Sequence, residues 1–111
     1  MNRGDIVVAA LPGDAGKPRP WIVLRGDRFA AHHRVTLLPL TSEIRDEPIL
    51  RVDVAPSAGN GLRVASQVMV DRSVRVPVGR VGGVIGRLAA ADMRSIERAV
   101  LVYLGFADRL R

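Results

Sequence analysis

Short runs of apolar and β-branched residues, separated by glycine, proline and charged residues, occupy most of the chain. The run from Asp5 to Leu11 ends at a Pro-Gly turn signal, and the run from Ile49 to Val54 alternates apolar and charged side chains as a half-exposed strand does. Runs of this kind cover residues 5–11, 21–24, 34–40, 49–54, 63–70, 72–76 and 81–88. Since residues 63–76 read either as one bent strand or as two, the pattern predicts five to seven strands. Pro39 indicates an edge or a bulge near the end of the third run.

The period of the apolar positions changes after residue 88. Over residues 89–104 the apolar side chains fall on one stripe with spacings of three and four residues, as in an amphipathic helix: Met93, Ile96, Val100, Tyr103 and Leu104. Gly105 follows at the position of a left-handed C-terminal cap. Strands followed by one helix predict a mainly β (α+β) fold, either a small barrel or a twisted antiparallel sheet, with the C-terminal helix closing one face.

The length of 111 residues corresponds to a single domain over residues 1–111. The chain has no cysteine, which excludes disulfides, thiolate metal sites and cysteine nucleophiles. No apolar run approaches the roughly 20 residues that cross a bilayer, and the N-terminus lacks the apolar core of an export signal. We therefore expect a cytoplasmic protein without a membrane segment.

The formal net charge is +6, from 17 basic and 11 acidic residues, and Lys17 is the only lysine. Such a surface attracts a polyanion or an acidic protein segment, although arginine-rich composition also follows from G+C-rich coding. The aromatic residues are Trp21, Phe29, Tyr103 and Phe106, which are too scattered for a base-stacking platform. The composition favours an anionic partner and disfavours a protein that passively coats RNA.

Two short segments offer candidate chemistry. Arg19 lies between Pro18 and Pro20, which fix their own φ and restrict Arg19 to extended backbone, so its guanidinium loses little entropy on binding. Thr41 and Ser42 place two hydroxyls directly after the third run. Each segment also has a structural explanation, because prolines can simply stiffen a connection and a Thr-Ser pair after a strand is commonly a turn or a cap.

Other features are weaker candidates. His32 and His33 are adjacent, would point to opposite faces of an extended chain and have no carboxylate at a recognisable spacing, so we expect solvated loop residues. The glycines at 79, 82, 83 and 86 lack the spacing and the lysine of a phosphate-binding loop, and we interpret them as bends in a strand. Asp92 and Glu97 do not share a helix face, so we expect them to serve solvation and the helix dipole. We expect no metal site.

The order of the motifs is more specific than any one of them. Before the helix the chain carries, in this order, Arg3-Gly-Asp-Ile6, Arg19-Pro-Trp-Ile-Val-Leu24, Pro39-Leu-Thr-Ser42, Ser66-Gln-Val-Met-Val-Asp71 and Ile85-Gly-Arg-Leu88. This order resembles the MazF/PemK-type toxins, the endoribonucleases of bacterial type II toxin-antitoxin pairs, over nearly the whole chain. The resemblance implies a CcdB/PemK-like, SH3-like small barrel that forms a homodimer, with RNA lying across the dimer groove.

The resemblance also implies a chemistry that needs no cofactor. In metal-free cleavage the 2′-hydroxyl of the RNA attacks the phosphate, so the enzyme helps to deprotonate it, neutralises charge on the phosphoryl oxygens and helps the 5′-oxygen to leave. Arg19 matches the catalytic arginine, a permanently charged bidentate donor to the scissile phosphate. Thr41 matches the catalytic threonine, which bonds the phosphate or the 2′-oxygen, and Ser42 is implied to bind RNA.

The implied substrate is single-stranded RNA, because in-line attack by the 2′-oxygen is blocked in an A-form helix. Sequence-selective cleavage of such RNA would inhibit translation and growth. The implied partner is a cognate antitoxin, whose acidic disordered tail folds into the basic groove and competes with RNA.

Two segments depart from the family pattern. Members carry a longer first loop with a Gly-Ser-Glu-Gln-like stretch, whereas residues 12–18 are short and lack that serine, so we expect Lys17 to supply part of the missing grip on RNA. After Asp71 many members read Asp-Gln-x-Arg followed by a later Asp. Here Arg72, Val74 and Pro77 occupy those positions. Arg72 and Arg75 are therefore expected only to support RNA binding.

Two alternatives to the endoribonuclease stay open at this point. A CcdB-like toxin would poison DNA gyrase by contact, would keep its activity without Arg19 and would depend on the C-terminal end around residues 103–106. A catalytically degenerate family member would bind RNA or protein without cutting it.

Overall fold

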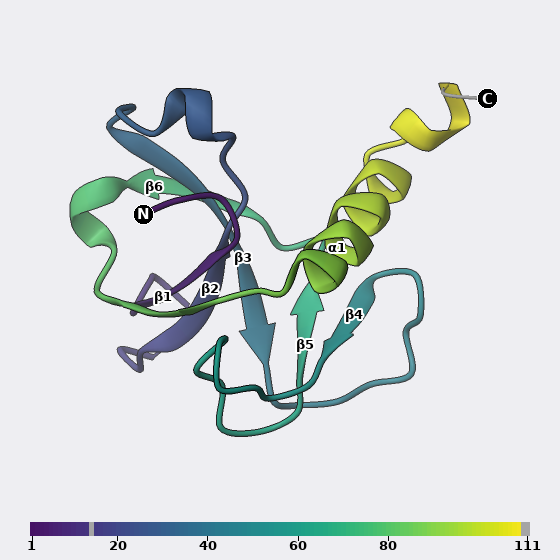
Figure 1. Cartoon of the computed structure of the whole chain (residues 1–111), viewed down its shortest axis with the longest axis horizontal. Coiled ribbons are helices and arrows are strands. Elements are labelled where there is room, and N and C mark those ends of the chain that lie inside the picture. The colour runs from purple at the N-terminus through teal and green to yellow at the C-terminus, as the bar shows by residue number, and fades with distance from the viewer. Residues whose placement is uncertain (14, 110–111) are drawn as a thin grey trace.

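A strongly curled antiparallel sheet with one helix packed against it forms the fold of this computed structural model, which describes residues 1–13 and 15–109 (Figure 1). The strands are β1 (Asp5–Ala9), β2 (Arg19–Val23), β3 (Arg34–Thr41), β4 (Arg51–Val54), β5 (Ser66–Met69), β6 (Val74–Pro77) and β7 (Val84–Arg87), followed by helix α1 (Ala90–Tyr103). Short 3-10 helices at Asp27–Phe29, Val78–Arg80 and Phe106–Arg109 were not indicated by the sequence pattern. The predicted mainly β fold with one C-terminal helix is confirmed. Within the described residues, no helix has the length and apolar character needed to cross a bilayer.

Strand β3 is the centre of the sheet. The strand order is β4-β5-β3-β2-β1-β7, and β6 pairs with β3 outside this path. Residues 34–37 of β3 pair with β6, and residues 40–41 pair with β5. Pro39, which has no N–H to give to a ladder, lies between these two segments, so the edge or bulge predicted there is a change of partner strand.

The strands are mostly shorter than the apolar runs that predicted them. Leu11 and Leu88 are only 6% exposed although β1 ends at Ala9 and β7 ends at Arg87, because their side chains enter the core after the ladder has ended. The opposite error occurs in β2, which begins at Arg19, two residues before the predicted run. Arg19 is therefore part of the sheet and not of the connection before it.

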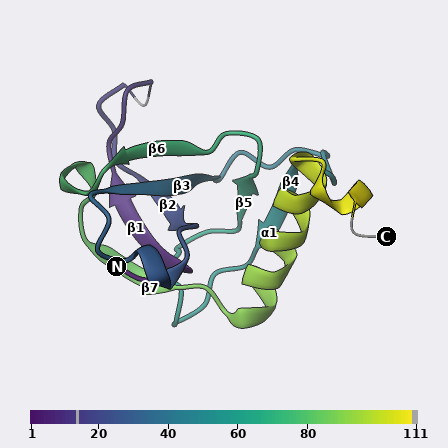
Figure 2. The same ribbon diagram turned by 90° about the horizontal axis from the view of Figure 1, so that it is seen from above.

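Alternate residues of the sheet form two apolar clusters, one on each face. Ile6, Ile22 and Leu38 pack in the cluster that α1 covers through the fully buried Ile96. Val7 and Trp21 belong to the other cluster, which fills the inside of the curl. Figure 2 shows α1 beside β4 and β5 and away from β6, so one helix covers only part of the sheet. Because successive side chains of a strand point to opposite faces, the two clusters show that the central strands are buried on both faces.

The helix departs from its prediction at its end. Met93 and Val100 pack against the core, but Tyr103 and Leu104 are 48% and 58% exposed, because the last turn of α1 extends past the sheet (Figure 1). Gly105 has a φ of +83°, which confirms the left-handed cap. Glu97, expected to be solvated, instead accepts a hydrogen bond from Nη2 of Arg3 at 2.7 Å. This pair attaches α1 to the segment before β1.

Candidate active-site groove

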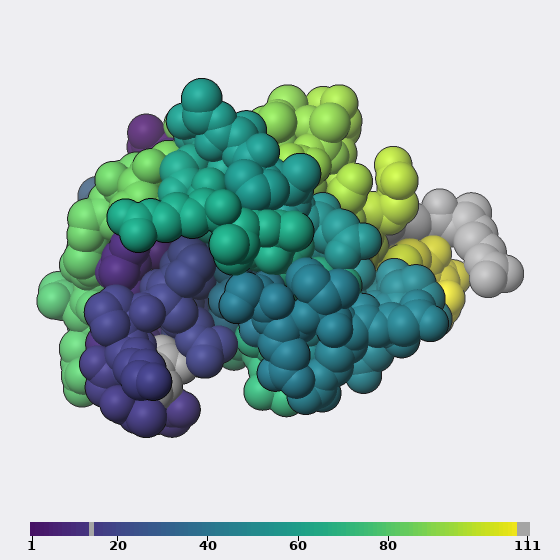
Figure 3. All heavy atoms as spheres, turned by 90° about the horizontal axis from the view of Figure 1, so that it is seen from below, coloured from purple at the N-terminus to yellow at the C-terminus, as the bar shows by residue number. Residues whose placement is uncertain are grey.

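A groove of about 470 Å³ opens beside the end of β3 and the start of β2. Its lining includes four of the six site residues predicted from the sequence: Lys17, Arg19, Thr41 and Ser42. The rest of the lining includes residues 61–64, Ser66 and Ile85. Figure 3 shows this face of the molecule, where the dark blue segment before β2 and the lighter blue segment after β3 lie on either side of a notch. The groove thus joins four separate parts of the chain.

The register of the sheet explains why Arg19 and Thr41 meet. Trp21 pairs with Pro39 in the β2–β3 ladder, and continuing this antiparallel register by two residues places Arg19 opposite Thr41. Side chains directly opposite each other on one face have Cβ atoms about 5 Å apart. Arg19 also pairs with Ala9 on β1, so its backbone is extended, as the flanking prolines predicted. Two motifs that are distant in the sequence therefore share one site.

The hydroxyl of Thr41 both closes a turn and keeps a proton to donate. Its Oγ1 accepts a hydrogen bond from the backbone N–H of Glu43 at 3.1 Å, which closes the turn after β3. A hydroxyl that accepts this bond still has its own proton to donate. The turn therefore fixes the oxygen of Thr41 and leaves its proton available to an acceptor in the groove.

The buried side-chain amide of Gln67 holds the segment that follows this turn. Gln67, on β5, is 4% exposed and makes four hydrogen bonds. Its Oε1 accepts bonds from the backbone N–H of Arg45 and from Nη1 of Arg51, each at 3.0 Å. Its Nε2 donates to the backbone carbonyl of Arg45 at 3.0 Å and to Oδ1 of Asp53 at 2.9 Å. A fully bonded buried network of this kind holds its members in one arrangement.

Arg51 extends this network to the segment that follows Thr41. Its Nη1 also donates to the backbone carbonyl of Glu43 at 3.0 Å, and the side chain of Arg51 is only 6% exposed. The sequence analysis included Gln67 within a motif but assigned it no role, and it did not select Arg51. An arginine in an alternating strand gave no signal that its guanidinium turns inward.

Glu43 and Arg45 form an exposed ion pair in the segment that follows Thr41 and Ser42, with Nη2 of Arg45 at 2.8 Å from Oε1 of Glu43. The hydrogen bond from Arg45, and then its charge, lower the pKa of Glu43, and the charges of Arg51 and Arg72 lower it further. The same bond raises the pKa of Arg45. Arg72 therefore lies close enough to act electrostatically on the segment that follows Thr41.

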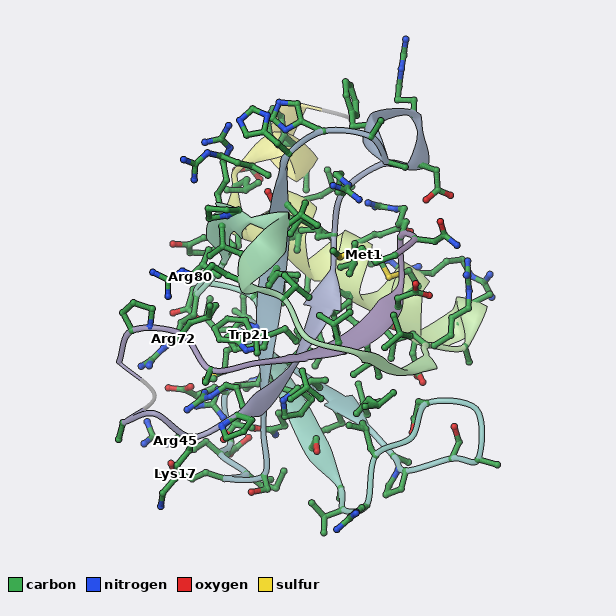
Figure 4. The ribbon with its side chains drawn as sticks, turned by 90° about the vertical axis from the view of Figure 1, so that its left-hand side faces the viewer. Met1, Lys17, Trp21, Arg45, Arg72 and Arg80 are labelled. Carbon is green, nitrogen blue, oxygen red and sulfur yellow. The ribbon has the colours of Figure 1, made fainter. Side chains whose placement is uncertain are left out.

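Neither Arg72 nor Arg75 lies in the groove lining. Arg72 is exposed after β5, and Figure 4 shows Lys17, Arg45 and Arg72 following one another along one edge of the molecule, with Arg80 beyond them. Arg75 is opposite Thr36 on β3 and lines a separate depression with Arg25, Phe29, His32 and Arg34. That depression is at the start of β3, whereas Thr41 is at its end.

The groove lacks the usual groups of acid-base catalysis and metal binding among the described residues. Its described lining contains neither a carboxylate nor an imidazole, and no cluster of metal-ligating side chains occurs in residues 1–13 and 15–109. His32 and His33 are exposed, as expected, but their rings stack with centroids 4.6 Å apart and do not point to opposite faces. The chemistry available in the described groove is therefore that of cations and hydroxyls.

Comparisons with known proteins agree with this geometry. Residues 2–104 match the family model described as "PemK-like, MazF-like toxin of type II toxin-antitoxin system". A curated relative from Mycolicibacterium smegmatis, named "Probable endoribonuclease MazF", is 43% identical over 108 residues, which are 96% of this chain and 99% of the relative.

Two solved structures extend the comparison. The Mycobacterium tuberculosis toxin MazF-mt6 has a TM-score of 0.78 at 29% identity, over 91% of this chain and 96% of its own. An endoribonuclease from Mycobacterial species, solved in complex with its cognate antitoxin, has a TM-score of 0.78 at 23% identity, over 95% of each chain. The second likeness concerns the fold alone.

Proposed function

The chain belongs to the PemK-like, MazF-like family of type II toxins and is an endoribonuclease toxin, and from this premise we propose that it cleaves single-stranded RNA in a sequence-selective reaction without a metal ion. The observation that carries the proposal is the groove in which Arg19 and Thr41 meet. Its described lining has three cationic side chains, Lys17, Arg19 and Arg63, beside the hydroxyls of Thr41 and Ser42. Such a lining suits a phosphodiester whose negative charge increases during the reaction.

In the proposed reaction the 2′-oxygen of the RNA forms a bond to the adjacent phosphorus, and the bond from phosphorus to the 5′-oxygen breaks. Arg19 donates two parallel hydrogen bonds to the non-bridging oxygens and offsets their charge. Thr41 donates its hydroxyl proton to a phosphoryl oxygen or to the 2′-oxygen, while its turn bond to Glu43 fixes its position. Because the described lining has no carboxylate or imidazole, the 2′-proton leaves to water and the 5′-oxygen takes its proton from water.

The partners of the chain follow from the same premise. We propose that the toxin acts in the cytoplasm as a homodimer, and that its antitoxin presents an acidic segment to the basic groove. The net charge of +6 and the cations of the groove support an acidic partner. Lys17, Ser42, Arg72 and Arg75 are proposed to bind RNA, the first two within the groove and the others outside it.

A cleavage assay tests this function. A long single-stranded RNA is incubated with the purified chain in EDTA, the cut positions are mapped, and the nucleotide on the 5′ side of one cut is replaced by its 2′-deoxy form. We expect cleavage in EDTA, loss of the cut at the deoxy position, and loss of all cuts with Arg19→Ala. Absence of cleavage by the wild type would contradict the proposal and favour a toxin that acts by contact, such as a gyrase poison. Undiminished cleavage by Arg19→Ala would contradict the catalytic role proposed for Arg19.

A further inference from the structure

The lining of the groove carries a further cation, Arg63, that no motif indicated. Residues 61–64 lie in the connection between β4 and β5, although the sequence analysis placed residues 63 and 64 in the strand run 63–70, and Arg63 is among the residues that line the groove. Strands β4 and β5 are paired at Val54 and Ser66, so the connection leaves and re-enters the sheet at one place. The loop has no strand ladder of its own to fix it.

The side chain of the buried Asn60 fixes this loop by hydrogen bonds to its backbone. Asn60 is 2% exposed, and its Oδ1 accepts the backbone N–H groups of Ser57 and Leu62, each at 3.0 Å. Its Nδ2 donates to the backbone carbonyl of Ala55 at 2.8 Å, and its own N–H donates to Oγ of Ser57 at 3.1 Å. A polar side chain that is buried and satisfied in this way determines the conformation of the backbone around it.

The loop also lies directly on β7. The backbone N–H of Arg87 donates to the carbonyl of Gly59 at 2.8 Å. Gly61 has a φ of +70°, and a Cβ added there would collide with the carbonyl of Ile85. A Cβ added at Gly86 would collide with the backbone of Asn60. The approach of the two backbones requires glycine on both sides, and it fixes the wall that presents Arg63.

Arg63 has no structural partner that accounts for its position. Its side chain is exposed, and it makes no hydrogen bond or ion pair among residues 1–13 and 15–109. By contrast, the guanidinium of Arg51 is buried and bonded to three acceptors. Arg63 also shares the groove with Lys17 and Arg19, and like charges repel one another unless an anion lies between them.

We propose that Arg63 binds the RNA phosphate adjacent to the scissile one. This inference rests on the proposed function, because it assigns a second contact to the same substrate. Arg19 uses both of its parallel donors on the non-bridging oxygens of the scissile phosphate, so a second guanidinium from another segment of the same groove is available for the next phosphate of the strand. Two contacts from two segments fix the direction of the backbone across the groove, which in-line attack by the 2′-oxygen requires.

The salt dependence of binding tests the proposal without relying on cleavage. The probe is a random-sequence RNA pool with uniform 2′-O-methylation, which has no free 2′-hydroxyl, and its dissociation constant is measured at several salt concentrations. Each phosphate contact on a single strand contributes a slope of about 0.7 in log K against log salt. We expect Arg63→Gln to reduce the slope by about 0.7 and Arg63→Lys to keep it.

The matched control is Arg94→Gln, which removes the same charge. Arg94 is exposed on α1 and lines a depression with Arg3 and Arg87, at the end of β1 opposite to Ala9 and Arg19. We expect its slope to equal that of the wild type. Equal slopes for Arg63→Gln and the wild type, or an equal fall in both glutamine variants, would overturn the proposal, as would a fall in Tm that accompanies an unchanged slope.

The outcomes separate this inference from the proposed function. A wild type that binds the methylated pool with the expected slopes but does not cut unmodified RNA contradicts the function and leaves the phosphate contact standing. A wild type that cuts RNA in EDTA while Arg63→Gln keeps the full slope contradicts the contact alone. A wild type that neither binds the pool nor cuts unmodified RNA contradicts both.

Discussion

The two ends of β1 use arginine in opposite ways. At the start of the strand, Arg3 pairs with Glu97 at 2.7 Å and Arg87 contacts Asp5 at 3.5 Å. Beyond its other end, Lys17 and Arg63 have no carboxylate partner among the described residues, and the groove that they line has no acidic side chain in its described lining. The two pairs of basic residues are therefore used differently. Arg3 and Arg87 are paired with carboxylates where the helix is attached to the sheet, and Lys17 and Arg63 are exposed where a substrate could enter.

This difference shows that an arginine acquires its role from its acceptors. Arg3 donates to Glu97 and, through Nη1, to the carbonyl of Leu24 at 2.6 Å, so its charge is used within the fold. The groove is held by other means, namely neutral or buried side chains such as Gln67 and Asn60. Substitutions in the groove should therefore reduce cleavage without unfolding the protein, and substitutions at the start of β1 should do the reverse.

The largest effect is expected for substitution of Arg19, and Arg19→Lys tests its geometry apart from its charge. Lysine keeps the charge but cannot donate two parallel bonds to one phosphate, so we expect the single-turnover rate of RNA cleavage to fall by about 10³-fold. The Tm should remain within about 2 °C of the wild-type value, since Arg19 is half-exposed at the start of its strand. A lysine variant with nearly full activity would mean that charge alone is required at this end of the sheet.

Thr41→Val should follow, with a fall in the same rate of about 10²-fold, because a neutral donor contributes less than a charged one. Valine keeps the shape of threonine and removes the hydroxyl. Thr41→Ser, which restores a hydroxyl at the same position, is the matched control and should recover most of the rate. If serine does not rescue the rate, loss of the hydroxyl does not explain the effect of valine, because serine can accept the turn bond from Glu43 and donate its own proton.

Gln67→Met tests the buried support of the groove. Methionine fits a similar volume but leaves the N–H of Arg45 and the carboxylate of Asp53 without the partner that Gln67 provides. We expect the free energy of unfolding to fall by about 2 kcal/mol, measured by urea denaturation. Cleavage at a temperature where the variant is folded should fall less than in Thr41→Val. Unchanged stability would contradict the network described here.

Arg3→Ala should lower the stability of the protein at the start of β1 and leave cleavage unchanged. The pair with Glu97 is about one-third exposed, with side-chain exposures of 32% and 37%, so we expect a loss of only about 1 kcal/mol in the free energy of unfolding. This corresponds to a fall in Tm of roughly 4–8 °C in a thermal scan. The cleavage rate per folded molecule should match the wild type. A loss of cleavage without a loss of stability would mean that Arg3 takes part in the reaction and not only in the fold.

The smallest effect concerns the exposed pair of Glu43 and Arg45. The hydrogen bond from Arg45 lowers the pKa of Glu43 from its ordinary value of 4.5, so the pair stabilises the folded state above that pH. The stabilisation disappears as the pH falls through the lowered pKa. Thermal scans of the wild type and Glu43→Gln should therefore differ slightly at pH 7 and converge in acid. A difference that grows as the pH falls would have the wrong sign.

The sequence identified more of the candidate groove around Arg19 and Thr41 than on the segment that carries Arg63. Arg19 and Thr41 were identifiable because prolines and a strand end mark them locally, and Lys17 and Ser42 adjoin them in the chain. Arg63 gave no such signal, since its position depends on the approach of the 55–62 loop to β7. A contact between two backbones that are far apart in sequence cannot be inferred from either segment alone.

The same limit applies to the fold. Hydrophobic periodicity reports burial, so it included Leu11 and Leu88 in strands that end before them. It does not report where the sheet ends, so it assigned Tyr103 to a buried stripe that the structure leaves exposed. Nor does it specify pairing, and only the pairing of β6 with β3 shows that Arg75 faces a separate depression.

The most direct test of the division between the two ends measures cleavage and stability on the same preparations of Arg19→Ala and Arg3→Ala. Each variant is assayed on one long single-stranded RNA in EDTA and in a thermal scan. We predict that Arg19→Ala loses cleavage by about 10³-fold at an unchanged Tm, and that Arg3→Ala keeps its cleavage rate at a lower Tm. Cleavage by Arg19→Ala at the wild-type rate would contradict the assignment of the reaction to the groove.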